Sequence, residues 1–138
     1  MPVTLIKLGG SLLSLPDLPA RLEWLLRQFP DDQTLLLVGG GPTTNVVRDW
    51  DRVHSLDAAI AHDLAIESLR LNQSLLTRLL PGLDMVGTRT AAAVAWESGQ
   101  RALLDVPEYL QVEEPEHPQL SLPRSWQATS DAIAAWVR

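Results

Sequence analysis

Two short apolar runs in this sequence each lead directly into a run of glycines. Residues 3–8 read VTLIKL and precede Gly9 and Gly10, and residues 34–38 read TLLLV and precede the glycines at 39–41. Apolar runs of this length, rich in branched side chains and bounded by glycine, are typical of buried strands. The sequence therefore predicts two strands that both end in a glycine loop.

A helix is predicted between these two strands. Leu22, Leu25, Leu26 and Phe29 recur at i, i+3, i+4 and i+7, the spacing of an amphipathic helix, and Pro30 marks its end. Strand, helix and strand then follow one another, which is the order of a parallel crossover unit.

The rest of the chain continues this alternation. The sequence predicts a short helix over 43–52, a long helix from Leu56 to the Pro81-Gly82 turn, a strand over 83–86, a helix over 88–98 and a strand over 101–106. The long helix rests on the spacing of Ile60, Leu64, Leu71, Leu75 and Leu79.

Residues 111–123, with three prolines and three glutamates, predict a solvated loop, and a last helix is expected from Thr129 or Ser130 to the end of the sequence. Strands that alternate with helices indicate a mainly parallel sheet covered on both faces. We therefore expect an α/β fold, a three-layer αβα sandwich, forming a single domain over residues 1–138.

The composition excludes several classes of function. The chain of 138 residues carries a net charge of −6 with scattered arginines, which argues against a nucleic-acid-binding surface. No apolar segment approaches the roughly 20 residues needed to span a membrane. The absence of cysteine excludes disulfides and thiolate sites and fits a cytoplasmic protein. No spacing of metal ligands is found, so we predict no metal site built from side chains.

The two glycine loops are candidate anion sites. Glycine after a parallel strand lets the backbone approach a ligand, and ligands bind beyond the carboxyl ends of such strands. Neither loop has the spacing of a Walker A motif or of G-x-G-x-x-G. The alternative is that both loops are tight turns that bind nothing.

Lys7 stands beside the first glycine loop. The chain contains ten arginines and this single lysine. A compact, flexible ammonium at that position suits a phosphoryl group that moves during a reaction. The alternative is a surface lysine whose alkyl stem covers apolar neighbours.

Three segments together resemble the amino acid kinases, the family of acetylglutamate, glutamate, aspartate and uridylate kinases. IKLGGSLL is similar to their first strand and phosphate loop, LLLVGGGPTTNVVR to their second strand and acceptor loop, and SWQATSDAIAAW to the segment that bears their organising aspartate. The last segment, with AHDLAI at 61–66, most resembles the branch that acts in methanofuran and tetrahydromethanopterin one-carbon metabolism.

The resemblance implies roles for particular residues. It implies that Lys7 contacts the transferred phosphoryl group, that Asp131 positions this lysine, and that ATP and Mg²⁺ are used. Residues implied to bind the terminal phosphates of the nucleotide are Gly9, Gly10 and Ser11. Residues implied to line the site of an anionic acceptor are Gly39, Gly40, Gly41, Asn45 and Arg48.

Two of the candidates have a plain structural alternative. Asp131 could equally be a carboxylate that stabilises the first turn of a helix through the helix dipole. His62, a further candidate for contact with the acceptor, lies in the middle of the long helix, where a histidine is commonly just a partly buried polar residue.

Relative to the family, the chain is expected to correspond to the acceptor-binding part, because it ends at residue 138, shortly after Asp131, and has no second lysine. The expected function is ATP-dependent phosphorylation of a small carboxylate- or phosphate-bearing acceptor, in one-carbon cofactor synthesis by the resemblance. The alternative is a catalytically inactive module that binds a small anion, or a subunit that needs a partner. Apolar surface where the other half would pack favours a homo-oligomer or a complementing subunit.

Overall fold

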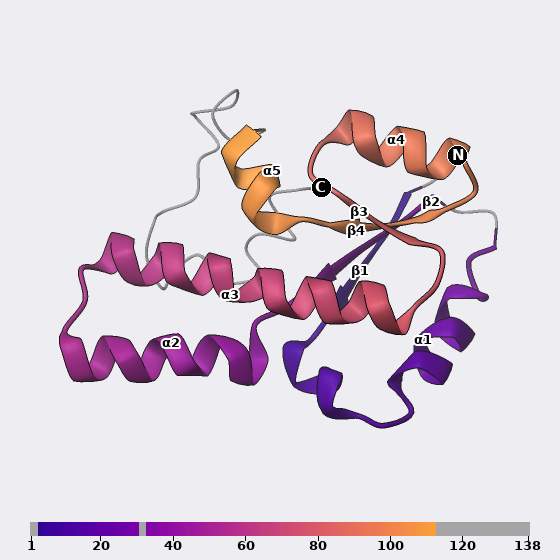
Figure 1. The fold of residues 1–138 in the computed structure, drawn as a ribbon. Helices are drawn as coiled ribbons and strands as arrows, with labels where there is room; N and C mark the ends of the chain where they lie inside the picture. Colours follow the sequence, from indigo (N-terminus) through magenta and orange to yellow (C-terminus); the bar gives the residue numbers. More distant parts are fainter. Residues whose placement is uncertain (1–2, 31–32, 113–138) are drawn as a thin grey trace.

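A four-stranded parallel sheet forms the centre of the molecule. The computed structural model describes residues 3–30 and 33–112 (Figure 1). The strands are β1 (Val3–Leu8), β2 (Gln33–Val38), β3 (Leu83–Val86) and β4 (Arg101–Leu104). They lie in the order β1-β2-β4-β3, and each pairs with its neighbour in parallel. The predicted α/β class with a parallel sheet is therefore confirmed.

Helices connect these strands. They are η1, a short 3-10 helix (Gly10–Ser14), α1 (Leu18–Leu26), α2 (Gly41–His54), α3 (Ala58–Leu79), α4 (Arg89–Glu97) and α5 (Val106–Val112). Because the strands are parallel, every strand ends at the same edge of the sheet, and the loops after the strands gather there.

The sheet is covered on both faces, so the molecule has three layers (Figure 1). Leu36, Val38 and Leu103 pack on one face in a cluster with side chains of α1 and α3. Leu35 and Leu104, which alternate with them along the strands, pack on the other face in a cluster with side chains of α4 and α5. Continuous apolar strands are expected when both faces of a parallel sheet are buried.

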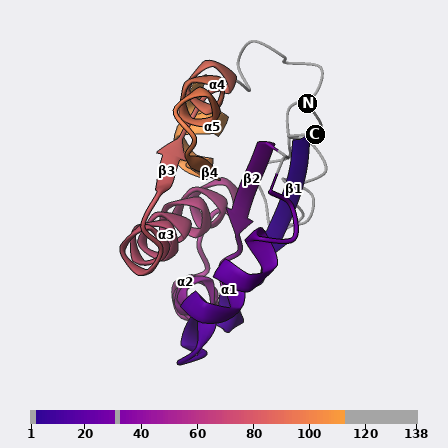
Figure 2. The same cartoon turned by 90° about the vertical axis from the view of Figure 1, so that its right-hand side faces the viewer.

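Helix α2 belongs to neither of the two helical layers on the sheet and packs alongside α3 instead (Figures 1 and 2). It is longer than the predicted 43–52, because Gly41 and Pro42 form its first turn and its last turn reaches His54. Proline is well suited to a first helical turn, where its missing N–H has no partner to lose.

Two predicted boundaries are wrong at the end of β4. The strand stops at Leu104 rather than at 106, because Asp105 begins the turn into α5. Its Oδ1 accepts a hydrogen bond from the Glu108 backbone N–H at 3.3 Å, and its carbonyl oxygen accepts one from the Tyr109 N–H at 2.9 Å. Gln111 and Val112 belong to α5 rather than to the predicted loop. The remainder of that loop, the last predicted helix and Asp131 lie outside the described residues.

The apolar side chains that predict α3 do not form its buried face. The helix is present, but four of these side chains are 36–67 % exposed, namely Ile60, Leu64, Leu71 and Leu75. Asn72 and Gln73 are instead buried among the core side chains and are at most 3 % exposed. Both buried amides have hydrogen-bond partners on other elements, which makes their burial possible.

Candidate functional site

The two glycine loops meet at the carboxyl edge of the sheet. Residues Lys7 and Leu8 of β1 pair with Leu37 and Val38 of β2, and the Gly39 N–H donates to the Leu8 carbonyl at 2.8 Å. The loops therefore leave the sheet side by side.

Gly10 and Gly41 bring the two loops into backbone contact. A Cβ on Gly10 would lie 2.5 Å from the Gly41 nitrogen, and a Cβ on Gly41 would lie 2.5 Å from the Gly10 carbonyl carbon. Gly41 also has φ +52°, a left-handed conformation that favours glycine. Both positions therefore require glycine for reasons of space, and the first loop and the second form one structural unit.

Asn72 of α3 fixes the second glycine loop through side-chain hydrogen bonds. Its Nδ2 donates to the carbonyl oxygens of Gly39 at 2.8 Å and of Gly40 at 2.9 Å, and its Oδ1 accepts from Thr43 Oγ1 at 2.8 Å. The side chain is only 3 % exposed. Each polar atom of the Asn72 amide is thus used to fix the position of this loop.

These bonds orient the N–H groups of the loop. A trans peptide holds its N–H opposite its C=O, and the described residues contain no cis peptide bond. Because the carbonyls of Gly39 and Gly40 point at Asn72, the N–H groups of Gly40 and Gly41 point away from α3. The backbone of Gly40 has a right-handed helical conformation and that of Gly41 a left-handed one. This alternation points successive N–H groups into one shallow concavity that can bind an anion.

Lys7 lies next to this unit. Its side chain is exposed, and it lies on β1 two residues before Gly9 and beside Leu37, which itself lies two residues before Gly39. Alternation along the strand puts Lys7 on the same face of the sheet as Leu5, the face that α4 and α5 partly cover. The structure thus places Lys7, Gly9, Gly10 and Ser11 together with the second glycine loop.

Asn45 and Arg48 follow in the first half of α2. The Arg48 Nη1 donates to Asn45 Oδ1 at 2.8 Å, and both side chains are exposed. The contact holds the guanidinium beside the beginning of α2, close to the glycine loop from which the helix starts. A guanidinium in this position can pair with a carboxylate or a phosphate.

His62 lies apart from this group. It is ten residues before Asn72 on α3, which corresponds to about 15 Å of helix. It lines a separate hollow of about 420 Å³ together with Glu67 of α3 and Leu110 of α5, and it is 6 % exposed. The structure does not bring His62 to the glycine loops.

A second buried polar cluster, which the sequence did not predict, lies at the same edge of the sheet. Gln73 Nε2 donates to Asp105 Oδ1 at 3.4 Å, and Gln73 Oε1 accepts from the Val106 backbone N–H at 3.1 Å. Gln73 is fully buried and Asp105 is 8 % exposed. The cluster joins α3 to the start of α5 and so fixes the end of β4 beside the second glycine loop.

Asn72 and Gln73 are therefore the site residues that sequence reasoning missed. The available signal was an adjacent amide pair within a helix that is otherwise rich in leucine, from Leu69 to Leu79. Buried amides in an apolar helix are rare without specific partners.

Among residues 3–30 and 33–112, no group of three or more His, Asp or Glu side chains is arranged to hold a metal ion. Over the same residues, no helix is both long and apolar enough to cross a membrane.

A comparison with solved structures identifies the type of fold. The chain superposes on a uridylate kinase from Archaeoglobus fulgidus with a TM-score of 0.56 and 22 % sequence identity, covering 75 % of this chain and 50 % of that kinase. No protein-family model and no curated protein matches the sequence. The chain thus shares the α/β fold of this uridylate kinase, and it spans about half the length of that kinase.

Proposed function

We propose that this chain takes part in phosphoryl transfer from ATP to a small anionic acceptor. The observation that carries the proposal is the backbone contact of Gly10 with Gly41, which joins two glycine loops at the ends of neighbouring parallel strands, beside Lys7. Loops of this kind offer N–H groups to phosphate oxygens, and phosphoryl transfer depends chiefly on positioning and on neutralising charge.

The placement of the residues supports a division of roles. Gly9, Gly10 and Ser11 would bind the terminal phosphates of ATP, and Gly39, Gly40 and Gly41 would line the acceptor site, with Arg48 and Asn45 pairing with its anionic group. An ionised oxygen of the acceptor's carboxylate or phosphate would attack the γ-phosphorus while the bond to the departing ADP oxygen breaks, so no proton has to be removed. Lys7 would stabilise the charge on the moving phosphoryl group.

Mg²⁺ fits this proposal as an ion carried by the nucleotide. Magnesium is commonly held by phosphate oxygens with only one or two carboxylates, so the lack of an acidic cluster among the described residues is compatible with its use. The ion would neutralise phosphate charge. Two further assignments depend on the resemblance of the sequence alone. They are that Asp131 positions Lys7 and that the acceptor belongs to one-carbon cofactor synthesis.

We propose further that two copies associate through the outer face of α2 and α3. Large apolar side chains there are 36–75 % exposed. These side chains, which we call the α2–α3 apolar face, are Val46, Trp50, Val53, Ile60, Leu64, Leu71 and Leu75. Monomers rarely expose a contiguous apolar patch beyond roughly 300–600 Å², and a specific interface buries about 800 Å² per partner. Seven such side chains would supply the apolar centre of an interface between copies.

Helix geometry places both parts of this face on one side. The bonds of Thr43 with Asn72 and of Thr44 with Ser68 mark where the two helices face each other. Successive residues of a helix are turned by about 100° around its axis. In each of the two helices the exposed apolar side chains therefore lie roughly 70–100° around the axis from the side that contacts the other helix, and the direction of this rotation is the same in both when each is viewed from its N-terminus. Because the helices are antiparallel (Figure 1), that sense turns both stripes to the same side of the pair. Arg48 and His62 lie in the opposite sense, so self-association would leave them accessible.

The first test is calorimetric titration of the full chain with ATP and Mg²⁺, followed by measurement of ADP release with a panel of carboxylates and phosphomonoesters. Lys7→Ala should lower turnover at least 100-fold. The control Arg27→Ala, which removes an exposed arginine directly after the last turn of α1, should not. Anion binding that is indifferent to Lys7→Ala, with no transfer to any acceptor, would favour the binding-module alternative. No binding at millimolar ATP would overturn the proposal for the isolated chain.

A further inference from the structure

The buried amide of Gln73 has a sulfur atom among its hydrogen-bond partners. Its Nε2 donates to Asp105 Oδ1 at 3.4 Å and to Met85 Sδ at 3.6 Å, and its Oε1 accepts from the Val106 N–H at 3.1 Å. The side chain is fully buried, so these bonds replace its contacts with water. The phosphoryl transfer proposed above assigns no role to this cluster.

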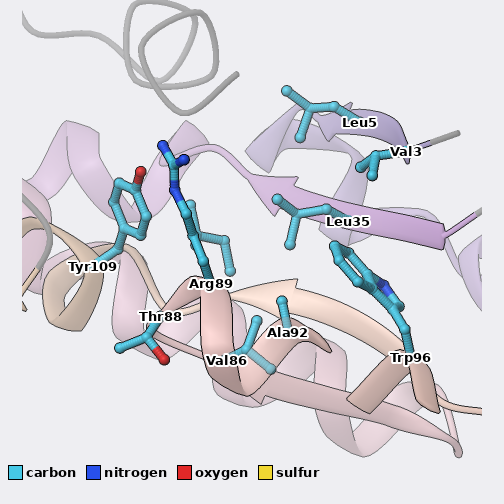
Figure 3. Close-up of a pocket in the computed structure, with 10 residues that line it drawn as sticks. Val3, Leu5, Leu35, Val86, Thr88, Arg89, Ala92, Trp96 and Tyr109 are labelled. Atoms are coloured by element: carbon cyan, nitrogen blue, oxygen red, sulfur yellow. The ribbon is translucent and has the colours of Figure 1, made fainter. Parts of the chain in front are cut away.

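Met85 connects this buried amide to the surface. It lies on β3, at the edge of the sheet, two residues after Leu83, which packs on the face that α1 and α3 cover. Alternation along the strand turns Met85 to that same face and Val86 to the opposite one, where Val86 lines an apolar groove of about 680 Å³ (Figure 3). Because no described strand lies beyond β3, Met85 is 37 % exposed, whereas Leu83 is 9 % exposed.

We infer that Met85 is a site of reversible oxidation, at which a peroxide loosens the attachment of α5 to α3. The sequence contains no cysteine, so Met85 carries the only sulfur atom among residues 3–30 and 33–112. Hydrogen peroxide can reach a side chain of this exposure, and methionine is commonly oxidised to the sulfoxide. The inference concerns the Gln73 cluster and does not depend on the proposed phosphoryl transfer.

The reaction transfers one oxygen atom from hydrogen peroxide to the sulfur. A lone pair of Met85 Sδ attacks one peroxide oxygen, the S–O bond forms and the O–O bond breaks. The departing oxygen takes up the proton of the transferred oxygen and leaves as water. The sulfur is thereby oxidised by two electrons to the sulfoxide, and the peroxide is reduced.

The sulfoxide conflicts with the present position of the Gln73 amide. A thioether sulfur is a weak hydrogen-bond acceptor, whereas the sulfoxide is polar and presents an oxygen. This oxygen would attract Gln73 Nε2, but the 3.6 Å between Sδ and Nε2 leaves no room for it unless the amide moves. Movement of the amide lengthens its bonds to Asp105 and to the Val106 N–H, the two bonds that join α3 to the start of α5.

Peroxide treatment of the full chain tests this inference. Peptide mass spectrometry should show one added oxygen at Met85, at a rate within about tenfold of that of methionine in a short unstructured peptide. Oxidation should lower Tm by about 3–8 °C. Exchange of the Val106 amide hydrogen should become at least about tenfold faster, because its bond to Gln73 Oε1 is weakened. Methionine sulfoxide reductase should restore both values.

Met85→Leu is the matched control. Leucine has a similar volume, and exchanges between leucine and methionine are usually well tolerated. After peroxide treatment, the variant should keep the Tm and the Val106 exchange rate that it has before treatment. Met1 is retained in this variant, so any effect of its oxidation appears in the control as well.

Three results would overturn the inference. Oxidation of Met85 more than about 100-fold slower than in the peptide would mean that the sulfur is shielded from peroxide. Complete oxidation with unchanged Tm and unchanged Val106 exchange would mean that Gln73 keeps its bonds beside the sulfoxide. Equal changes in Met85→Leu would assign the effect to another residue. No result involves ATP or an acceptor, so this test and the test of the proposed function can fail independently.

Discussion

Gly10 and Gly41 lie so close that a Cβ on either one would come within 2.5 Å of the backbone of the other. The two residues are 31 positions apart and follow two different strands. Their contact makes the loops after β1 and β2 a single unit at the carboxyl edge of the sheet, the edge at which parallel sheets bind ligands.

Alanine at position 10 should therefore destabilise the fold. Gly10→Ala is expected to lower the free energy of unfolding by about 1–3 kcal/mol, because the new methyl group must push the two loops apart. Gly9→Ala is the matched control: its Cβ would meet only Ser11 Oγ at 4.0 Å, and its φ of −63° suits alanine. Its stability should stay the same or rise slightly. Urea denaturation of both variants checks this, and equal losses would contradict the contact.

Asn72 should be essential to the second glycine loop. Asn72→Leu keeps the size of the side chain but removes the donors to the Gly39 and Gly40 carbonyls, and leaving buried carbonyls unpaired is expected to cost about 2–4 kcal/mol of unfolding free energy. Amide hydrogen exchange at Gly40 and Gly41 should also become faster. A loss below 0.5 kcal/mol, with exchange unchanged, would mean that the loop keeps its shape without Asn72.

Arg48 should affect the acceptor more than the nucleotide. Arg48→Ala is expected to weaken the binding of an anionic acceptor by about 10- to 100-fold, the usual value of one charge-assisted hydrogen bond, with little change in ATP affinity. Arg52→Ala is the control, since Arg52 pairs with Asp49 on the same helix. Titration of each variant with acceptor and with ATP separates the two effects, and a loss confined to ATP would reverse the assigned roles of the loops.

Charge on the α2–α3 apolar face should prevent self-association. Trp50 and Leu71 are 51 % and 67 % exposed, so Trp50→Asp and Leu71→Asp should leave the fold intact. In sedimentation experiments the unchanged chain is expected to form a dimer or larger oligomer, and the double variant a monomer with an unchanged circular dichroism spectrum. A chain that is monomeric before any substitution would rule out this interface.

Much of the fold follows from local sequence patterns. The run VTLIKL before Gly9 and the run before Gly39 form strands because branched apolar side chains favour a buried, extended chain, and glycine ends each one. Helix α4 (Arg89–Glu97) lies within the predicted 88–98, since the Thr88 hydroxyl caps its first turn and the left-handed Gly99 follows its end. These features depend on neighbours within a few residues, so the sequence alone predicts them.

The sequence by itself determined the class of fold, the order of strands and helices along the chain, and the positions of the two glycine loops. Tertiary structure decided which side of α3 is buried, because Asn72 and Gln73 find partners more than 30 residues away in the Gly39–Gly40 loop and at Val106. It also separated His62 from the glycine loops and put Gly10 against Gly41. Each of these results depends on contacts between distant segments, and such contacts leave no periodic signal along the chain.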